Sequence, residues 1–242
     1  MSIETKEEKV EVSHKTAFII TSMINSKLKS VYSSQERLDQ TIRTINSIQS
    51  QEEWKEKEKG NPPFCLLVEL SELTTTQKDI LNKKVDKILD LSKDSKAQDY
   101  SQQKSLGDIY STIIGCIYLK LKQPEVSNVY KISGRYYLDE KFSLEKNKKE
   151  RNECKILFRK IVHNIPDYKT VCYETKLYMF KSLDKLLILL TKAIELINKR
   201  IVTDVEHAFY YLLKDSTPEE RTETDCIGIS GYIAPSGEFQ SV

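Results

Sequence analysis

Residues 15–22 read Lys-Thr-Ala-Phe-Ile-Ile-Thr-Ser, an apolar and β-branched run that ends in small hydroxyl residues. A short run of this kind is typical of a buried strand. Ser33 then precedes Glu36 at the spacing of a capping box, and apolar residues recur at helical intervals at Leu38, Ile42, Ile45 and Ile48. The stretch predicts a strand followed by a helix over residues 34–50.

The same order repeats along the chain. Residues 64–70 (Phe-Cys-Leu-Leu-Val-Glu-Leu) predict a second strand, and Thr74 and Gln77 a second capping box before a helix whose apolar face carries Ile80, Leu81, Val85, Ile88 and Leu89. After a polar, turn-rich stretch at 92–105, we expect further elements in this order: a helix around 106–117, a strand at 129–137, a strand at 171–175, a helix over 183–197, a helix from near 203, and a strand or extended tail at 227–233.

Alternating strands and helices predict an α/β fold with a mostly parallel central sheet and helices on both faces. A chain of 242 residues can form one α/β domain around a single hydrophobic core, and we expect this domain at residues 15–237. Residues 1–14, which precede the first apolar run, are expected to be a flexible N-terminus. Ligands of such sheets bind beyond the carboxyl ends of the strands.

The composition of the chain indicates which partners and which cellular compartment to expect. The 38 basic and 36 acidic side chains leave a formal charge of +2, which recommends neither nucleic acid nor an anionic membrane as a partner. The apolar run at 186–190 is far shorter than the roughly 20 residues that span a bilayer, so no transmembrane segment is expected. A charged N-terminus and five cysteines without CxxC spacing predict a cytoplasmic protein with free thiols.

Two short motifs suit the binding of an anion. Lys131-Ile-Ser-Gly-Arg135 places two cations and a hydroxyl around a glycine turn at a strand end, where they can grip a diphosphate. Lys104-Ser105-Leu106-Gly107-Asp108 begins a helix, where free amides and the helix dipole favour an anion. Each has a structural alternative: Lys131 and Arg135 can be rim charges, and Ser105 can be an N-cap with Asp108 as its N3 partner.

Two acidic positions are open to two interpretations each. Glu69, at the end of the second strand, can accept hydrogen bonds from a base or a ribose, or it can be one acidic residue after a buried strand. Glu206 beside His207 offers a base and a proton carrier, but Thr203 and Glu206 also have capping-box spacing. The common motifs of nucleotide hydrolases, zinc enzymes and serine hydrolases are missing from the sequence.

Taken together, several segments resemble a family, the small GT-A-type glycosyltransferase-like proteins of polysaccharide gene clusters and large DNA viruses. The segments that carry the resemblance are 34–48, 68–71, Lys104-Ser105-x-Gly107-Asp108, Tyr130-Lys131-Ile132-Ser133-Gly134-Arg135-Tyr136, Thr175-Lys176-Leu177-Tyr178, Val205-Glu206-His207 and 228–234. They span roughly Ala17 to Gly237, and the segment at 130–136 is the distinctive one. The resemblance implies a nucleotide-sugar half at 15–135 and an acceptor half at 136–237.

The resemblance implies a glycosyltransferase that takes a nucleotide-sugar donor and a glycan acceptor, acting in polysaccharide biosynthesis or viral glycosylation, in the host cytoplasm if the protein is viral. The donor residues it implies are Ser22, Arg37, Glu69, Ser71, Lys104, Asp108, Lys131, Ser133 and Arg135; the acceptor residues are Tyr136 and His207; and the catalytic base is Glu206 or Asp139. The alternative is a noncatalytic binding or scaffold protein that retains a transferase-like fold.

One departure from the family concerns the metal. GT-A enzymes commonly hold Mn²⁺ or Mg²⁺ on the sugar diphosphate with an Asp-x-Asp motif, whereas this chain has Ser133-Gly134-Arg135 near the expected place. No cofactor is therefore assigned, and the dependence on a divalent metal stays open. Fixed cations can supply the same charge stabilisation as a metal, which leaves a metal-independent transferase as one reading.

Overall fold

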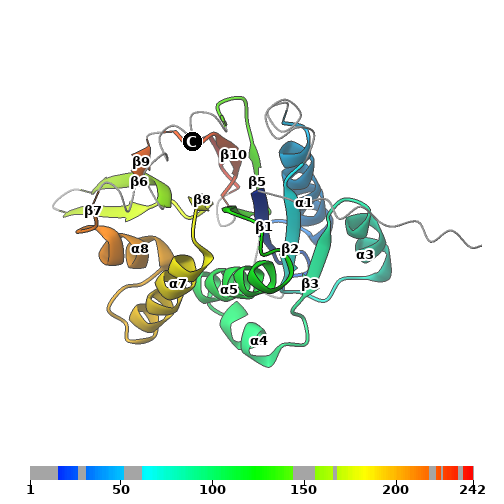
Figure 1. The fold of residues 1–242 in the computed structure, drawn as a ribbon, viewed down its shortest axis with the longest axis horizontal. Coiled ribbons are helices and arrows are strands. Elements are labelled where there is room, and N and C mark those ends of the chain that lie inside the picture. Colours follow the sequence, from blue (N-terminus) through cyan, green and yellow to red (C-terminus); the bar gives the residue numbers. More distant parts are fainter. Residues whose placement is uncertain are drawn as a thin grey trace, which may run out of the picture.

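The computed structural model describes residues 16–26, 31–51, 62–143, 156–165, 168–217, 222–224, 226–233 and 237–241. Its main feature is a twisted eight-stranded sheet with the order β3-β2-β1-β4-β8-β6-β7, in which β9 lies beside β6 (Figure 1). The strands are β1 (Thr16–Ser22), β2 (Phe64–Glu69), β3 (Lys87–Asp90), β4 (Asn128–Ser133), β6 (Ile156–Ile165), β7 (Tyr168–Tyr173), β8 (Leu177–Phe180) and β9 (Thr222–Thr224).

The sheet has a parallel half and an antiparallel half. β3, β2, β1 and β4 run parallel, whereas β8 is antiparallel to β4 and to β6, and β7 is antiparallel to β6. The four parallel strands bring their carboxyl ends to one edge of the sheet, which is where the candidate site lies.

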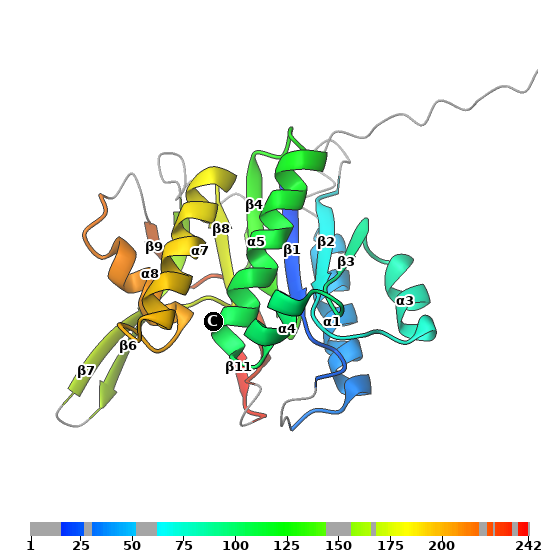
Figure 2. The same ribbon diagram turned by 90° about the horizontal axis from the view of Figure 1, so that it is seen from below.

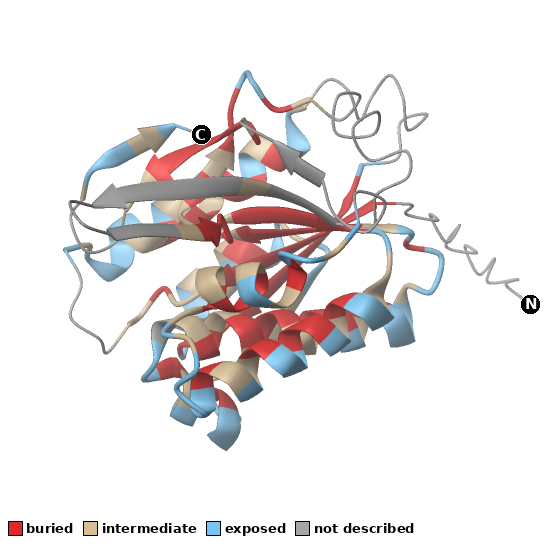
Figure 3. Cartoon of the chain, turned by 90° about the vertical axis from the view of Figure 1, so that its left-hand side faces the viewer, coloured by how far each residue is buried: buried red, intermediate tan, exposed pale blue. Residues whose placement is uncertain are grey.

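Two helical layers cover the sheet. Strand β1 alternates its side chains, so Phe18 and Ile20 pack toward α1 (Ser34–Gln49) and α3 (Thr75–Asn82), while Ala17 and Ile19 pack toward the other layer. That layer contains α4 (Ser95–Ser101), α5 (Lys104–Lys122), α7 (Leu183–Asn198) and α8 (Val205–Leu213). Figure 2 shows α5 and α7 side by side over the sheet, and Figure 3 shows that burial concentrates in the strands and the inner sides of the helices. The expected α/β fold with helices on both faces is confirmed.

A second, three-stranded sheet joins the C-terminal region to the middle of the chain. Its strands are β5 (Tyr136–Leu138), β10 (Ile229–Tyr232) and β11 (Phe239–Ser241), paired antiparallel in the order β11-β10-β5. It is fastened to α1 because Thr44 Oγ1 donates to the Tyr136 carbonyl over 2.6 Å and Leu138 N donates to Ser47 Oγ over 3.0 Å. These bonds fix the turn between β4 and β5.

Local signals placed the helix starts well. Both expected capping boxes are present, at Ser33 and Glu36 before α1 and at Thr74 and Gln77 before α3. Thr203 and Glu206 do not form the alternative capping box before α8. Asp204 caps this helix, and its side chain accepts from His207 N over 2.9 Å. The N-cap of α5 is Gln103 with no side-chain bond, so Ser105 is not a cap.

The structure corrects several expected elements. The second helix ends at Asn82, and Ile88 and Leu89 belong instead to β3, which pairs with the edge of β2. The polar stretch after residue 92 holds α4, and the strand expected at 129–137 is two strands separated by a turn at Gly134. Strands β6 and β8 are not predicted from the sequence. The expected flexible segment 1–14 lies outside the described residues. Among the described helices, none has the length and apolarity needed to cross a membrane.

Candidate functional site

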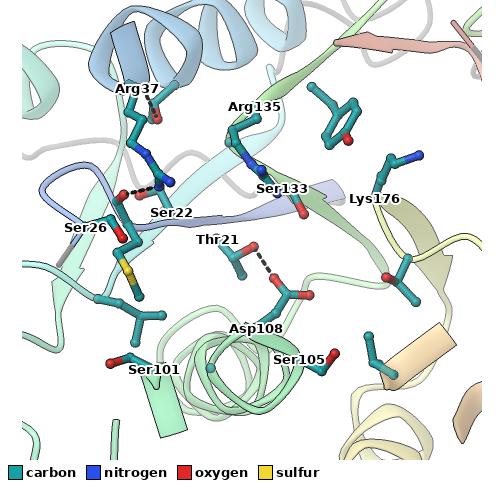
Figure 4. Close-up of a pocket in the computed structure, with 18 of the residues that line it drawn as sticks. Thr21, Ser22, Ser26, Arg37, Ser101, Ser105, Asp108, Ser133, Arg135 and Lys176 are labelled. Carbon is teal, nitrogen blue, oxygen red and sulfur yellow. Dashed lines mark hydrogen bonds between the residues drawn. The ribbon is translucent and has the colours of Figure 1, made fainter. Parts of the chain in front are cut away.

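A cavity of about 520 Å³ opens at the carboxyl ends of β1 and β4, between α1 on one side and α5 and α8 on the other (Figure 4). Seven of the residues implied by the resemblance line it: Ser22, Arg37, Asp108, Ser133, Arg135, Tyr136 and Glu206. They come from six elements and the turn after β4, and the fold gathers them in one place. This is the edge at which α/β sheets bind ligands.

One wall of the cavity is cationic. Arg37 extends from α1 and Arg135 from the turn after β4, and Figure 4 shows both side chains directed toward the space above Thr21. Arg37 Nη1 donates to the Met23 carbonyl over 2.8 Å, which holds the side chain in place. Burial and the nearby Arg135 both lower the pKa of Arg37, so the two guanidinium groups repel each other. Such a pair is well suited to a dianion.

The turn that presents Arg135 depends on Gly134. Gly134 N donates to the Thr21 carbonyl over 2.9 Å, and Arg135 N donates to the Ser133 carbonyl over 2.8 Å. A Cβ atom at Gly134 would lie 3.2 Å from Thr41 Oγ1 and 3.3 Å from the Thr21 carbonyl oxygen. A side chain there would crowd the end of β1, so glycine allows the turn to approach it closely.

Lys131 forms the floor beneath the cavity. Its side chain is 0 % exposed, and Nζ donates to Asp108 Oδ2 over 2.5 Å, to Ser133 Oγ over 3.0 Å and to the Thr175 carbonyl over 3.1 Å. Asp108 Oδ1 also accepts from Thr21 Oγ1 over 2.7 Å. Lys131 and Ser133 share a face of β4, as strand alternation predicts, but the ammonium lies under the cavity and is not among the residues that line it.

The opposite end of the cavity is acidic. Glu206 Oε1 accepts from Thr175 Oγ1 over 2.8 Å, and burial raises the pKa of Glu206. Asp204 lies two residues earlier, at the N-cap of α8, and forms a hydrogen bond with His207 Nδ1 over 2.7 Å, so His207 pairs with Asp204 and does not line the cavity. Asp204 caps α8, and Glu206, in the first turn of the helix, lines the cavity.

Lys176 completes this end. Its Nζ lies 2.8 Å from Glu174 Oε1, 2.5 Å from Gln240 Oε1 on β11, and 5.2 Å from the centre of the Tyr136 ring. Lys176, Thr175 and Asp204 line the cavity but are not among the site residues predicted from the sequence. A signal was present for the first two, because they belong to the segment 175–178 that carries part of the resemblance.

Glu69 and Ser71 form a buried cluster beside the cavity and do not line it. The Glu69 carboxylate is 0 % exposed and accepts from the backbone of Ile24 over 3.0 Å and of Ser71 over 2.9 Å, and from the Ser22 and Ser71 hydroxyls. Burial raises the pKa of Glu69. The carboxylate ties the loop after β1 to the loop after β2, and Ser22 is the member of the cluster that reaches the cavity.

Asp139 and Lys104 are also predicted from the sequence as site residues. Asp139 belongs to the small sheet, where it accepts from Ser230 Oγ over 2.6 Å, and it does not line the cavity. Lys104 begins α5, but its side chain lies outside the described residues.

The described side chains do not fit a divalent cation. Both Asp108 oxygens already accept, one from Thr21 and one from the ammonium of Lys131, and a cation placed there would meet that ammonium. Among the described residues, no group of three or more His, Cys, Asp or Glu side chains is arranged to hold a metal ion.

Comparisons with known proteins give structural likenesses only. No protein-family model matches the chain, and no curated protein matches its sequence. The solved structures similar to it include 4-diphosphocytidyl-2C-methyl-D-erythritol synthase from Anaerococcus prevotii (15% identity, 88% of this chain and 87% of that one, TM-score 0.44), mouse xyloside xylosyltransferase 1 (10%, 87% and 85%, 0.47), and the mannosyltransferase Ktr4p from S. cerevisiae (10%, 84% and 64%, 0.43). At such low identities and TM-scores, the likeness by itself assigns this chain no function.

Proposed function

We propose that this protein is a glycosyltransferase that moves a sugar from a nucleotide-activated donor to a hydroxyl group of a glycan or another acceptor. One observation carries the proposal: a single cavity at the carboxyl ends of β1 and β4 has two arginines on one wall and a carboxylate with a raised pKa at the other end. Transfer from a sugar diphosphate needs these two kinds of group, placed apart.

The arginine wall suits the diphosphate. When the bond from the sugar to the diphosphate breaks, negative charge grows on the leaving oxygen, and fixed cations stabilise that charge in the transition state. Arg37 and Arg135 converge on one space, and a dianion there would relieve the repulsion between them. Ser22 and Ser133 supply hydroxyl donors at the same edge.

The remaining surface divides in the way a two-substrate reaction requires. Met23, Leu70 and Gly107 line the part nearest β2 and α5, and we assign that part to the nucleoside. Tyr136, Lys176 and Glu206 line the part nearest β5 and α8, and we assign it to the sugar and the acceptor. The division follows the two halves expected at 15–135 and 136–237.

Glu206 is our choice for the base that takes the proton of the acceptor hydroxyl. A general base works best when its pKa approaches the operating pH, and burial moves the pKa of Glu206 in that direction. Asp139 remains a prediction from the resemblance, but its place on the small sheet, bound by Ser230, favours Glu206.

The resemblance further supports a role in polysaccharide biosynthesis or viral glycosylation. Asp108 is already neutralised by Lys131, and the cavity contains its own cations, so we propose that transfer does not depend on a divalent metal. Turnover should then be the same in EDTA and in Mn²⁺.

Calorimetric titration with UDP, GDP, CDP and ADP tests the donor site. We expect one of them to bind with a Kd in the micromolar range, and no binding of any of them at millimolar concentration would refute the proposal. Hydrolysis of UDP-glucose, UDP-N-acetylglucosamine, UDP-galactose and GDP-mannose then tests catalysis. Binding without turnover of any donor, with or without a hydroxyl acceptor, would favour the noncatalytic binding protein.

A further inference from the structure

Lys131 is a cation at the proposed site that has no donor left for a ligand. A lysine ammonium carries three N–H groups. In this structure they go to Asp108 on α5, to Ser133 at the end of β4, and to the carbonyl of Thr175 in the link before β8. The donors thus join three separate walls of the cavity from below.

The network continues from Lys131 to the proposed base. The Thr175 carbonyl accepts from Lys131, and the hydroxyl of the same residue donates to Glu206 Oε1 over 2.8 Å. A second route is electrostatic, because the negative charge of Asp108 acts to raise the pKa of Glu206. Lys131 balances that charge from 2.5 Å away.

We infer that Lys131 is a positioning residue, which holds Thr175 and pairs with Asp108 so that the Glu206 carboxylate is aimed at the acceptor. The inference rests on the proposed function for the part that concerns turnover. It replaces the expectation that Lys131 contacts the diphosphate, since all its donors are used within the protein.

Other groups around Glu206 bear on its titration and stay constant when Lys131 is changed. Asp204 lies on the same helix, and groups from the packed elements act on Glu206 or are acted on by it: Asp108 from α5, Tyr136 from β5, Cys172 from β7 and Tyr178 from β8. Glu174 and Lys176 flank Thr175 and pair with each other. Of these, Asp108 is the group whose charge loses its partner in a variant without the lysine.

The test compares Lys131→Met, which keeps the length of the side chain and removes the donors, with the control Lys120→Met. Lys120 forms an exposed ion pair with Asp184, far from the cavity. For Lys131→Met we expect nucleoside diphosphate affinity within threefold of the unchanged protein and turnover at least 100-fold lower. We also expect Glu206, followed by NMR of ¹³C-labelled glutamate and assigned with Glu206→Gln, to titrate at higher pH. The control should change none of the three.

Two results would overturn the inference. A fall of more than tenfold in diphosphate affinity would mean that Lys131 contacts the donor, and an unchanged Glu206 titration would mean that the lysine serves the fold alone. If Lys131→Met does not fold, the double variant Lys131→Met with Asp108→Asn removes the unpaired charge. It should fold and bind diphosphate but remain at least tenfold slower, and wild-type turnover would overturn the inference. The NMR titration needs no substrate, so it still decides if the proposed function fails.

Discussion

Replacement of Arg135 by alanine should weaken donor binding without harm to the fold. Arg135 lies at the cavity, with its guanidinium carbon 6.0 Å from the centre of the Tyr136 ring. Each charge-assisted hydrogen bond contributes about 1.5–3 kcal/mol. Since about 1.4 kcal/mol is a factor of ten in Kd, the loss of one such bond predicts diphosphate binding weaker by roughly 10- to 100-fold.

The same variant should leave the unliganded protein as stable as before. Arg135 lowers the pKa of Arg37 by repulsion, so its removal relieves unfavourable energy. Melting temperature should therefore stay the same or rise slightly. The matched control is Arg43→Ala, since Arg43 is an exposed arginine on α1 at 5.5 Å from the Tyr137 ring and does not line the cavity. Calorimetry and thermal unfolding on both variants decide: unchanged diphosphate affinity together with a lower melting temperature for Arg135→Ala would refute the reasoning.

Three further predictions test the site and its support. Glu206→Gln should lower turnover at least 100-fold with diphosphate affinity retained, and it should remove the rise of kcat with pH that a carboxylate base predicts for the unchanged protein. Because burial raises the pKa of Glu206, the folded protein favours the protonated carboxyl, and the free energy of unfolding falls as pH rises from the ordinary carboxyl pKa through the raised one. In urea titrations at several pH values, the free energy of unfolding of Glu206→Gln should fall less over this pH range than that of the unchanged protein. An identical pH dependence for the two proteins would contradict this. Gly228→Ala should lower the free energy of unfolding by about 3 kcal/mol or more, because the backbone of Gly228 has φ +77 and a Cβ atom there would lie 2.2 Å from Phe142 N. The melting temperature should fall by roughly 6–12 °C. A fall of less than about 2 °C would show that the loop adjusts without strain.

The sequence predicts best what is local. Ser33 and Thr74 mark two helix starts because a capping box depends on residues three apart, and the apolar run at 15–22 marks a buried strand. Ile88 and Leu89 fit the helical spacing set by Leu81, so periodicity could not show that they form β3. That strand depends on the edge of β2, which is a long-range partner.

The site divides in the same way. Lys131, Ser133 and Arg135 could be found because they lie on one short motif at a strand end. The role of Lys131 could not, because the carboxylate that draws its ammonium under the cavity comes from Asp108, on a separate helix. Glu206 was ambiguous for a related reason: whether Thr203 or Asp204 caps α8 depends on which side chain reaches the His207 amide.

The cavity has one practical consequence for the discovery of its ligand. Its lining runs from Thr21 to Glu206, and Lys176 is held by Gln240, so no single segment of the chain contains it and the site should vanish in the same transition as the fold. A ligand present at 100 times its Kd then adds about 2.7 kcal/mol to the free energy of unfolding. For a domain of this size that corresponds to a melting shift of roughly 5–11 °C. A plate-based melting screen of nucleotide sugars can therefore rank donors before any acceptor is known.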